Sequence, residues 1–377
     1  MTTDASDKGI SAFKCAQLRY RRQGAAPNRT DDVNDWLDFS NPTDDRMFRV
    51  ESPPRQDGLN YYKGPLYGIS NFPGFLYAPQ TLAPSLQDEL AYLAVSEYCE
   101  APHATNIDLL PSKASVEENN TSESMWELWK QQNGYGASTD DIIKENGHPT
   151  KKYRSFAKLS WSTMGYHYDW TARSYHEGAK SPMPFILEEL ATMFARTALA
   201  ASSQGNSTKF TASACIVNYY NTKSIMGGHR DDLELALDKP VISFSMGLPA
   251  VFLLGGKTKD EVPVLAILVR PGDVMMLGGD CRLSFHGMAR VLPAAVILPE
   301  ISKELGALES FQITRESMCR KDSTTDKRSP EVCEEIVPNS DRAALTEYLN
   351  THRININVRQ VLPDDMDVLP LLTVRNP

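Results

Sequence analysis

The chain has 377 residues, 41% of them hydrophobic, and a formal net charge of −9 at pH 7. This acidic net charge argues against strong, sequence-independent binding to duplex DNA, because such binding needs a basic surface that displaces counterions. The six cysteines contain no Cys-x-x-Cys pair, so neither a zinc knuckle nor a disulfide framework is expected. No apolar run approaches the ~20 residues of a membrane span, and we expect a soluble intracellular protein with no membrane contact.

The first 200 residues divide by composition into two parts. Residues 1–60 are polar and rich in charge and proline, so we expect an N-terminal arm that is partly extended and partly disordered. Residues 61–200 are expected to form a helical region that includes a lid. Three helices are predicted there, because apolar side chains recur at the spacing of one helix face, over 84–98, 122–132 and 184–201.

From residue 201 to 377 the pattern changes to short strands separated by turns. Strands are predicted over 210–220, 241–247, 250–254, 262–269 and 274–277, with turns at 226–228, 255–261 and 270–273. The last of these turns has proline and glycine at its two central positions, as a type II turn prefers. This pattern predicts a β-rich core.

Two histidines and an aspartate of this core form a candidate metal site. In His229-Arg230-Asp231 the imidazole and the carboxylate share one side of an extended backbone, because side chains two residues apart point the same way. His286 follows after several short strands, as expected when a ligand returns from the opposite sheet of a double-stranded barrel. Two histidines and one carboxylate bind Fe(II) and leave positions open for a cosubstrate and dioxygen.

This pattern leaves alternatives open. His286 can also be a hydrogen-bonded core histidine, and His167-Tyr168-Asp169 is a second His-x-Asp sequence in the chain. The β-rich surroundings favour His229 and Asp231 as the ligands.

The segment between His286 and residue 353 has three expected parts. An apolar strand is predicted over 291–298. Residues 299–340 then read mostly as loop, and a loop of that length inside a compact domain is generally functional or disordered, so we expect a flexible insertion. A short helix over 341–349 leads into the last strand.

The last strand, 353–359, alternates polar and aliphatic residues. Period two places Arg353, Asn355, Asn357 and Arg359 on one face. Two arginines on a buried face need anions to pair with. A guanidinium fork binds a carboxylate through two hydrogen bonds, so a bound dicarboxylic acid would satisfy both charge and geometry. The alternative is an edge strand whose polar face lies in water.

Taken together, these motifs resemble the AlkB family of Fe(II)- and 2-oxoglutarate-dependent dioxygenases, and more narrowly its eukaryotic AlkB homologue 1 branch. The motifs that carry the resemblance are, in chain order, Phe72-Pro73-Gly74-Phe75, Asn218-x-Tyr220, His229-x-Asp231, Phe252-Leu253-Leu254-Gly255-Gly256, His286 and Arg353-x-Asn355-x-Asn357-x-Arg359. The likeness covers most of the chain. One residue departs from the pattern, since the family usually has threonine where this chain has Asn357.

The resemblance implies a fold and a role for each site residue. The expected fold is α+β, with a double-stranded β-helix (jelly-roll) core over 201–377, supporting helices and an elaborated N-terminal region. The residues expected to bind Fe(II) are His229, Asp231 and His286. The residues expected to hold 2-oxoglutarate are Asn218, Tyr220, Arg353, Asn355 and Arg359, with Arg353 on the far carboxylate and Arg359 towards the metal.

The implied reaction is oxidative demethylation of nucleic acid. Dioxygen and 2-oxoglutarate would be consumed, succinate and carbon dioxide released, and an N-methyl group lost as formaldehyde. An enzyme that acts on a base stacks it in a pocket or takes it from a single strand, and the segment 161–170 is crowded with aromatic rings. The residues expected to contact the base are Trp129, Tyr166, His167 and Tyr168.

Three functions remain open at this point. The favoured one is a nucleic acid demethylase that acts on N1-methyladenosine in tRNA, N6-methyladenine in DNA, or both. The acidic net charge of the chain favours structured RNA or unpaired DNA as the partner of such a demethylase. The alternatives are a protein-directed 2-oxoglutarate hydroxylase with the same iron site, and a non-catalytic nucleic-acid-binding module, which a missing ligand would indicate. We expect a monomer in the nucleus, the mitochondrion or the cytoplasm.

Overall fold

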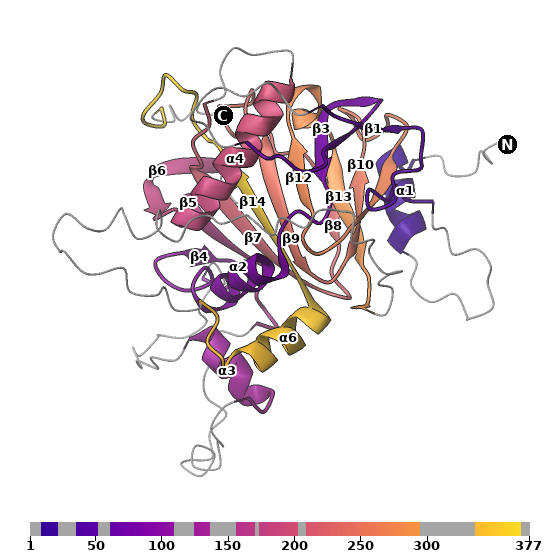
Figure 1. Cartoon of the computed structure of the whole chain (residues 1–377). Helices are drawn as coiled ribbons and strands as arrows, with labels where there is room; N and C mark the ends of the chain where they lie inside the picture. The colour runs from indigo at the N-terminus through magenta and orange to yellow at the C-terminus, as the bar shows by residue number, and fades with distance from the viewer. Residues whose placement is uncertain are drawn as a thin grey trace, which may run out of the picture.

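The computed structural model describes residues 9–21, 35–51, 61–108, 124–135, 156–169, 173–202, 209–294 and 336–370. In this part of the chain, two antiparallel sheets pack against each other and helices cover their outer faces (Figure 1). This is the α+β jelly-roll architecture that the family resemblance implies.

The larger sheet has ten strands. Along the sheet they are β1 (Met47–Arg49), β2 (Tyr67–Ile69), β3 (Phe72–Ala78), β12 (Val274–Leu277), β9 (Val241–Gly247), β14 (His352–Arg359), β7 (Ala214–Asn221), β5 (Trp161–Asp169) and β4 (Ala104–Thr105), with β6 (Ser174–Ser181) paired to β5. The pairings of β3 with β12 and of β5 with β7 join strands from residues 61–200 and 201–377. These two expected parts of the chain therefore share one sheet.

The smaller sheet has four strands. In spatial order they are β11 (Leu265–Val269), β10 (Ala250–Leu254), β13 (His286–Val291) and β8 (Met226–His229). Between the two sheets, Phe75 and Tyr77 of the larger sheet belong to one buried cluster with Leu254 and Ile267 of the smaller one. A short 3₁₀ helix, η2 (Gly279–Leu283), precedes β13.

Three helices cover the outer face of the larger sheet: α2 (Pro84–Ser96), α4 (Phe185–Ala201) and α6 (Arg342–Thr351). Their buried side chains, including Leu90 and Phe194, form one core with Phe244 and Ile356 of the sheet. Helix α3 (Met125–Gln132) packs against α2 at the lower edge of the view in Figure 1. Within the described residues, no helix has the length and apolar character that crossing a membrane requires.

Helix α1 (Ala12–Arg21) lies against the smaller sheet, on the right in Figure 1. Its buried residues are Phe13, Gln17 and Tyr20, which share one helix face. The expectation of an extended or disordered arm is therefore wrong for residues 12–21. The overall polar composition of residues 1–60 conceals these three positions.

The predicted strands agree best with the structure at the centre of the sandwich. β9, β10 and β12 have the predicted bounds. The strand predicted over 210–220 begins at Ala214, and the strand predicted over 262–269 begins at Leu265, because Val262 is 77% exposed in the preceding loop. The predicted helices over 84–98, 184–201 and 341–349 correspond to α2, α4 and α6, and 122–132 to α3.

Residues 226–228 belong to β8, and the prediction of a turn there is wrong. The two glycines suggested a turn, but at Gly228 the missing side chain makes room for a ring: an added Cβ would lie 2.6 Å from Phe13. The prediction of a strand over 291–298 is wrong for 292–294, because β13 ends at Val291, and residues 295–298 lie outside the described part of the chain. Residues 295–335, which contain most of the expected insertion, lie outside the described residues.

Candidate active site

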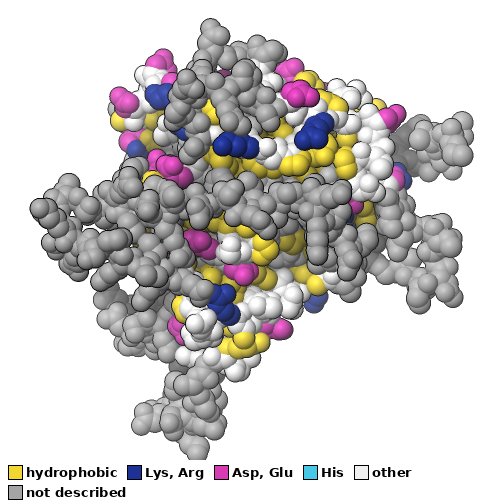
Figure 2. Space-filling view, viewed as in Figure 1, with side chains coloured by type: hydrophobic (Ala, Val, Ile, Leu, Met, Phe, Trp, Pro, Cys, Tyr) yellow, Lys and Arg dark blue, Asp and Glu magenta, His cyan; other side chains and the backbone are white. Residues whose placement is uncertain are grey.

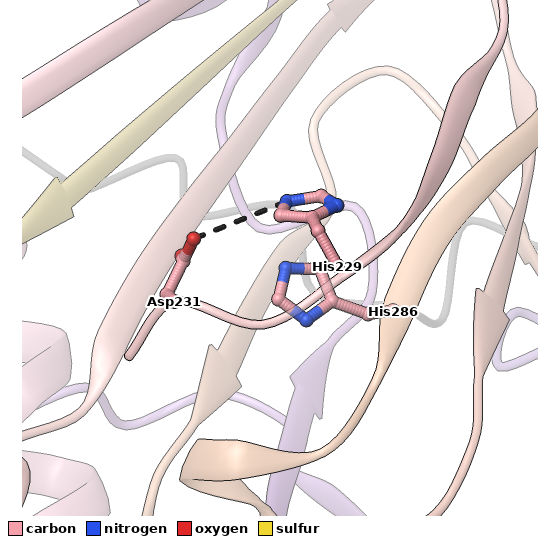
Figure 3. A group of neighbouring side chains, drawn as sticks. All are labelled: His229, Asp231 and His286. Atoms are coloured by element: carbon pink, nitrogen blue, oxygen red, sulfur yellow. Dashed lines mark ion pairs between the residues drawn. The ribbon is translucent and has the colours of Figure 1, made fainter. Parts of the chain in front are cut away.

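The pairing of β8 with β13 brings two histidines together. His229 at the end of β8 is the direct partner of His286 at the start of β13, and their ring centroids lie 4.4 Å apart. Asp231 follows two residues later, with a carboxylate oxygen 3.9 Å from His229 Nε2. The candidate ligand atoms of the three residues all lie within 4.8 Å of one another, and Figure 3 shows the Asp231 carboxylate facing the His229 ring.

The backbone fixes which ring nitrogen of each histidine is available to a metal. His229 Nδ1 donates to the Gly227 carbonyl at 3.0 Å, and His286 Nδ1 donates to the Ser284 carbonyl at 3.1 Å. Since Nδ1 carries the proton, Nε2 keeps its lone pair. Burial, together with the neighbouring His229, lowers the pKa of His286 to about 4. His286 is therefore neutral at pH 7 and able to bind a metal.

Two arginines hold the Asp231 segment in place. Arg359 Nη2 lies 3.2 Å from Asp231 Oδ2, and Arg282 Nη1 donates to the Asp231 backbone carbonyl. Burial would raise the pKa of the Asp231 carboxyl, but Arg359 and the two histidines lower it below its usual value. Asp231 is therefore ionised at pH 7, and Arg359 lies at the metal end of β14.

A second carboxylate, which the sequence analysis missed, completes this charge cluster. Glu234 has 1% of its side chain exposed and lies 2.9 Å from Arg282 Nη2 and 3.3 Å from Arg359 Nη1. It also accepts a hydrogen bond from the Tyr175 hydroxyl at 2.7 Å. Nothing in the spacing distinguishes Glu234 from the acids around it, and Tyr175 belongs to no motif. Only the pairing in space reveals their role.

At the other end of β14, Arg353 is buried; the buried Asp273 interacts with its charge, but no carboxylate of the described residues is within ion-pair distance. Arg353 is 4% exposed, and its guanidinium donates to the Leu248 carbonyl at 3.2 Å and to Ser245 Oγ at 2.9 Å. Its Nε has no hydrogen-bond partner among the described residues. Burial lowers the pKa of Arg353. A buried, unpaired cation is costly, so this end of the site is suited to bind an anion.

The register of β7 on β14 places polar groups beside Arg353. Tyr220 is the cross-strand partner of Arg353, and Asn218 is the partner of Asn355. The Asn355 amide donates to Ser243 Oγ at 2.8 Å and accepts from Asn357 Nδ2 at 2.9 Å. The departure from the family pattern at Asn357 thus has a local role, because its side chain orients the amide of Asn355.

One cavity of about 530 Å³ connects these groups. It extends from the buried Arg353 past the three metal-site residues to Arg173, whose side chain is 70% exposed at the mouth. Two further lining residues, Tyr168 and Tyr175, have ring centroids 5.5 Å apart and an angle of 67° between their planes. The volume is in the usual range for a small-molecule site.

Of the four residues predicted to contact a base, Tyr168 alone lines this cavity. The Tyr166 hydroxyl donates to Glu177 at 2.8 Å, and its ring lies 4.0 Å from Lys180 Nζ. His167 Nδ1 is hydrogen-bonded to Thr163 Oγ1 at 2.7 Å. These two side chains therefore have partners within the sheet.

Trp129 also lies away from the cavity. In α3 its ring stacks on Trp126 with centroids 5.2 Å apart and on Tyr135 with centroids 6.3 Å apart. Its third ring contact is with Tyr348 of α6, at 5.4 Å and 82°. The structure thus places Trp129 in the packing between two helices.

The second His-x-Asp sequence, at 167–169, is not part of a metal cluster. Asp169 lies 3.7 Å from His176 Nε2, and His167 is hydrogen-bonded to a threonine. In the part of the chain that the structure describes, His229, Asp231 and His286 are the one group of three metal-binding side chains within ligand distance of one another. This agrees with the preference for His229 over His167.

These residues fit Fe(II) and 2-oxoglutarate. Two imidazole nitrogens and one carboxylate oxygen are the donor set of a facial triad that leaves coordination positions open. The unsatisfied Nε of Arg353, whose guanidinium forms no ion pair with a described residue, lies on the same cavity and fits a carboxylate. The two sites are joined by one face of β14.

Comparisons with known proteins agree with this geometry. Residues 110–359 match the model of the 2OG-Fe(II) oxygenase superfamily. The chain is 29% identical over 361 residues to human nucleic acid dioxygenase ALKBH1, covering 96% of this chain and 80% of that protein. It is 30% identical over 391 residues to the DNA N(6)-methyladenine demethylase ALKBH1A of Arabidopsis thaliana, covering 95% and 98%. It is 28% identical over 287 residues to the tRNA demethylase abh1 of Schizosaccharomyces pombe, covering 75% and 86%. The chain therefore belongs to the 2OG-Fe(II) oxygenase superfamily, as an AlkB-family dioxygenase that uses Fe(II), 2-oxoglutarate and dioxygen.

Proposed function

We propose that this dioxygenase removes N-linked methyl groups from bases of nucleic acid. The observation that carries the proposal is that one cavity is lined by the buried Arg353, by the three metal-site residues and, towards the exposed Arg173, by the ring of Tyr168. Such a cavity has room for a small anion behind the metal and for a planar base in front of it. The relatives named as a nucleic acid dioxygenase, a DNA demethylase and a tRNA demethylase support this substrate class.

At the buried end, Arg353 would bind the far carboxylate of 2-oxoglutarate through its guanidinium fork, with Tyr220 and Asn218 beside it. Near the metal, Arg359 keeps Asp231 ionised and fixed in position. When bound, iron and 2-oxoglutarate supply the oxidising chemistry, which consumes dioxygen and releases succinate and carbon dioxide. The protein contributes binding and orientation.

Towards the mouth, the ring of Tyr168 would stack on the base and hold its methyl group towards the metal site, with the buried Tyr175 supporting that ring edge-on. Overall, one N-methyl base, one dioxygen and one 2-oxoglutarate give the demethylated base, formaldehyde, succinate and carbon dioxide. One oxygen atom leaves in formaldehyde and the other in succinate. The proton that replaces the methyl group comes from the hydroxymethyl intermediate as it releases formaldehyde.

The partner we propose is structured RNA or unpaired DNA. The net charge of −9 opposes a strong grip on duplex DNA. Figure 2 shows lysine and arginine side chains scattered among acidic and hydrophobic ones on the coloured part of this face, without a broad basic surface there. A base that is already unstacked reaches the cavity without the cost of opening a duplex. N1-methyladenosine in tRNA and N6-methyladenine in DNA are the first candidates.

The test is formaldehyde release from a panel of methylated RNA and DNA oligonucleotides, with Fe(II) and 2-oxoglutarate, followed by mass spectrometry of the nucleosides. We expect at least one methylated base to disappear while formaldehyde appears in equal amount. His229→Ala should abolish both signals, and His176→Ala, which changes a histidine outside the cavity, should retain them.

Two outcomes would refute the proposal. One is succinate formation that is equal with and without every nucleic acid tried. The other is hydroxylation of a peptide together with no loss of methyl from any oligonucleotide, which would make the enzyme a protein-directed hydroxylase.

A further inference from the structure

Three charged side chains line the mouth of the cavity: Arg173, Arg230 and Asp232. Asp232 lies between the two arginines. One of its carboxylate oxygens is 3.2 Å from Arg230 Nη2, and the other is 3.9 Å from Arg173 Nη2. The arginines come from different parts of the fold, since Arg173 immediately precedes β6 and Arg230 immediately follows β8. Two separate elements therefore direct cations at one point.

Arg230 is held in a defined position. Its guanidinium carbon lies 5.1 Å from the centroid of the Phe285 ring, and its Nη1 donates to the Lys257 carbonyl at 3.2 Å. Lys259 Nζ lies 5.5 Å from the centroid of the same ring, which adds a further cation beside the mouth. A guanidinium that is oriented before a ligand arrives loses less conformational freedom on binding.

Arg173 has an unusual backbone for its exposure. Its φ is +51°, in the left-handed region that residues other than glycine adopt rarely, although 70% of its side chain is exposed. Such conformations concentrate at ligand-binding and catalytic sites. Ion pairs as exposed as Arg173 with Asp232 add little to folding stability. Stability therefore does not explain why these three charges meet at the mouth.

We infer that Arg173 and Arg230 form a clamp that binds a backbone phosphate of the nucleic acid whose base occupies the cavity. While no phosphate is bound, the Asp232 carboxylate pairs with both arginines in its place. The inference rests on the proposed function and adds the residues that grip the strand. Two guanidinium forks suit the oxygens of a phosphodiester, and in an acidic chain they supply positive charge where the strand must lie.

The test is the affinity of full-length protein for a fluorescent single-stranded oligonucleotide, measured by anisotropy with Fe(II) and 2-oxoglutarate but without dioxygen. The oligonucleotide is used with and without the methylated base, over a series of salt concentrations. The variants are Arg173→Gln, Arg230→Gln and Asp232→Asn. The matched control is Arg49→Gln, an exposed arginine in β1 that does not line the cavity.

Each arginine variant should bind several-fold more weakly, and the slope of log affinity against log salt should fall by about 0.7 for each phosphate of a single strand that the protein no longer neutralises. The weakening should be the same for the methylated and unmethylated oligonucleotides, because the clamp reads the backbone. Asp232→Asn should bind more tightly than wild type. Demethylation of the free methylated nucleoside, which has no phosphate, should fall by a smaller factor in Arg173→Gln than demethylation of the methylated oligonucleotide.

The clamp is wrong if both arginine variants bind oligonucleotide with the affinity and salt slope of Arg49→Gln while wild type still demethylates it, and the proposed function then stands. It is also wrong if the arginine variants lose binding to an acidic peptide and keep binding to oligonucleotide. If Arg230→Gln loses Fe(II) as well, its effect comes through His229, and Arg173→Gln, on a separate element, decides the matter. A wild-type protein that neither binds nor demethylates any oligonucleotide would overturn the proposed function together with the clamp.

Discussion

The inner and outer ends of the cavity are built in different ways. The inner end lies on β14, which pairs with β7 over eight residues and with β9 over six, and its key side chain, Arg353, is buried. The outer end is formed by residues that follow β8 or precede β6, and Arg173 there is largely exposed. A register shared by three strands allows little adjustment, whereas residues at strand ends can change without disturbing the sheet. The inner end is thus suited to a constant cosubstrate and the outer end to a particular substrate.

The largest effect is expected at the metal site, which lies between the two ends, from Asp231→Asn. The substitution keeps the shape of the side chain but removes the charge that faces Arg359 and the two histidines. We expect no measurable succinate formation and a loss of Fe(II) binding, measured by calorimetry under anaerobic conditions. Asp232→Asn, one residue along the chain and outside the ligand set, is the control and should bind Fe(II) like wild type. Normal Fe(II) affinity in Asp231→Asn would remove this residue from the metal site.

The second test separates the cosubstrate from the metal. Arg353→Gln removes a buried charge that forms no ion pair with a carboxylate of the described residues. The loss of one partner of a buried, hydrogen-bonded charge pair costs about 2–5 kcal/mol, so the KM for 2-oxoglutarate should rise at least about 30-fold. Fe(II) affinity should remain close to wild type. Arg353→Lys should recover part of the loss, because it restores the charge but not the fork.

The inner end could be predicted from sequence and the outer end could not, for a physical reason. The alternation over 353–359 places Arg353 and Arg359 on the face that lines the cavity and Ile354 and Ile356 in the core, as period two requires. Regular backbone makes side-chain direction readable from spacing alone. Trp129 has no such constraint, and the structure places it between helices away from the cavity.

The charge cluster around Glu234, beside Asp231, could not be predicted from the sequence either. Glu234 and Tyr175 follow no repeating pattern, and their contact depends on how β6 folds back onto the segment after β8. The polar composition of residues 1–60 led to a wrong prediction for α1, because three buried side chains in a polar segment are enough for a helix to pack against the smaller sheet. Sequence thus predicts the strands and the ligands that they carry, while contacts between distant irregular segments need coordinates.

The third test concerns the charge cluster that supports Asp231. Glu234→Gln leaves Arg282 and Arg359 with one anion fewer, so Arg359 is drawn less firmly to its place beside Asp231. Loss of a group that orients a metal ligand lowers metal affinity about 10–100-fold. We expect a weaker affinity for Fe(II) with an unchanged KM for 2-oxoglutarate at saturating metal. The opposite result, a changed KM and unchanged Fe(II) affinity, would assign Glu234 to the cosubstrate end.

The fourth test compares the two strands that carry the histidines. β13 lies between β10 and β8, whereas β8 is at the edge of its sheet, and α1 supports it: Phe13 packs on Gly228, and Gln17 donates to the Met226 carbonyl at 3.1 Å. Phe13→Ala should lower Fe(II) affinity about tenfold, at the lower end of the effect of a supporting group. Phe13→Leu should restore most of it. If Phe13→Ala lowers the melting temperature alone, α1 stabilises the fold without positioning His229.

The smallest expected effect is the pH dependence of the metal-free protein. His286 has an ordinary pKa of 6.5, and burial lowers it to about 4, so between these values the unfolded chain binds more protons than the folded protein. The free energy of unfolding should therefore fall as pH drops from 6.5 towards 4. His103, His167 and His352 shift in the same direction through burial, so the comparison is made with His286→Gln. Urea denaturation in the presence of a chelator should show a shallower pH dependence for this variant. An equal dependence in both proteins would mean that His286 is no more protected from protons in the folded state than in the unfolded chain.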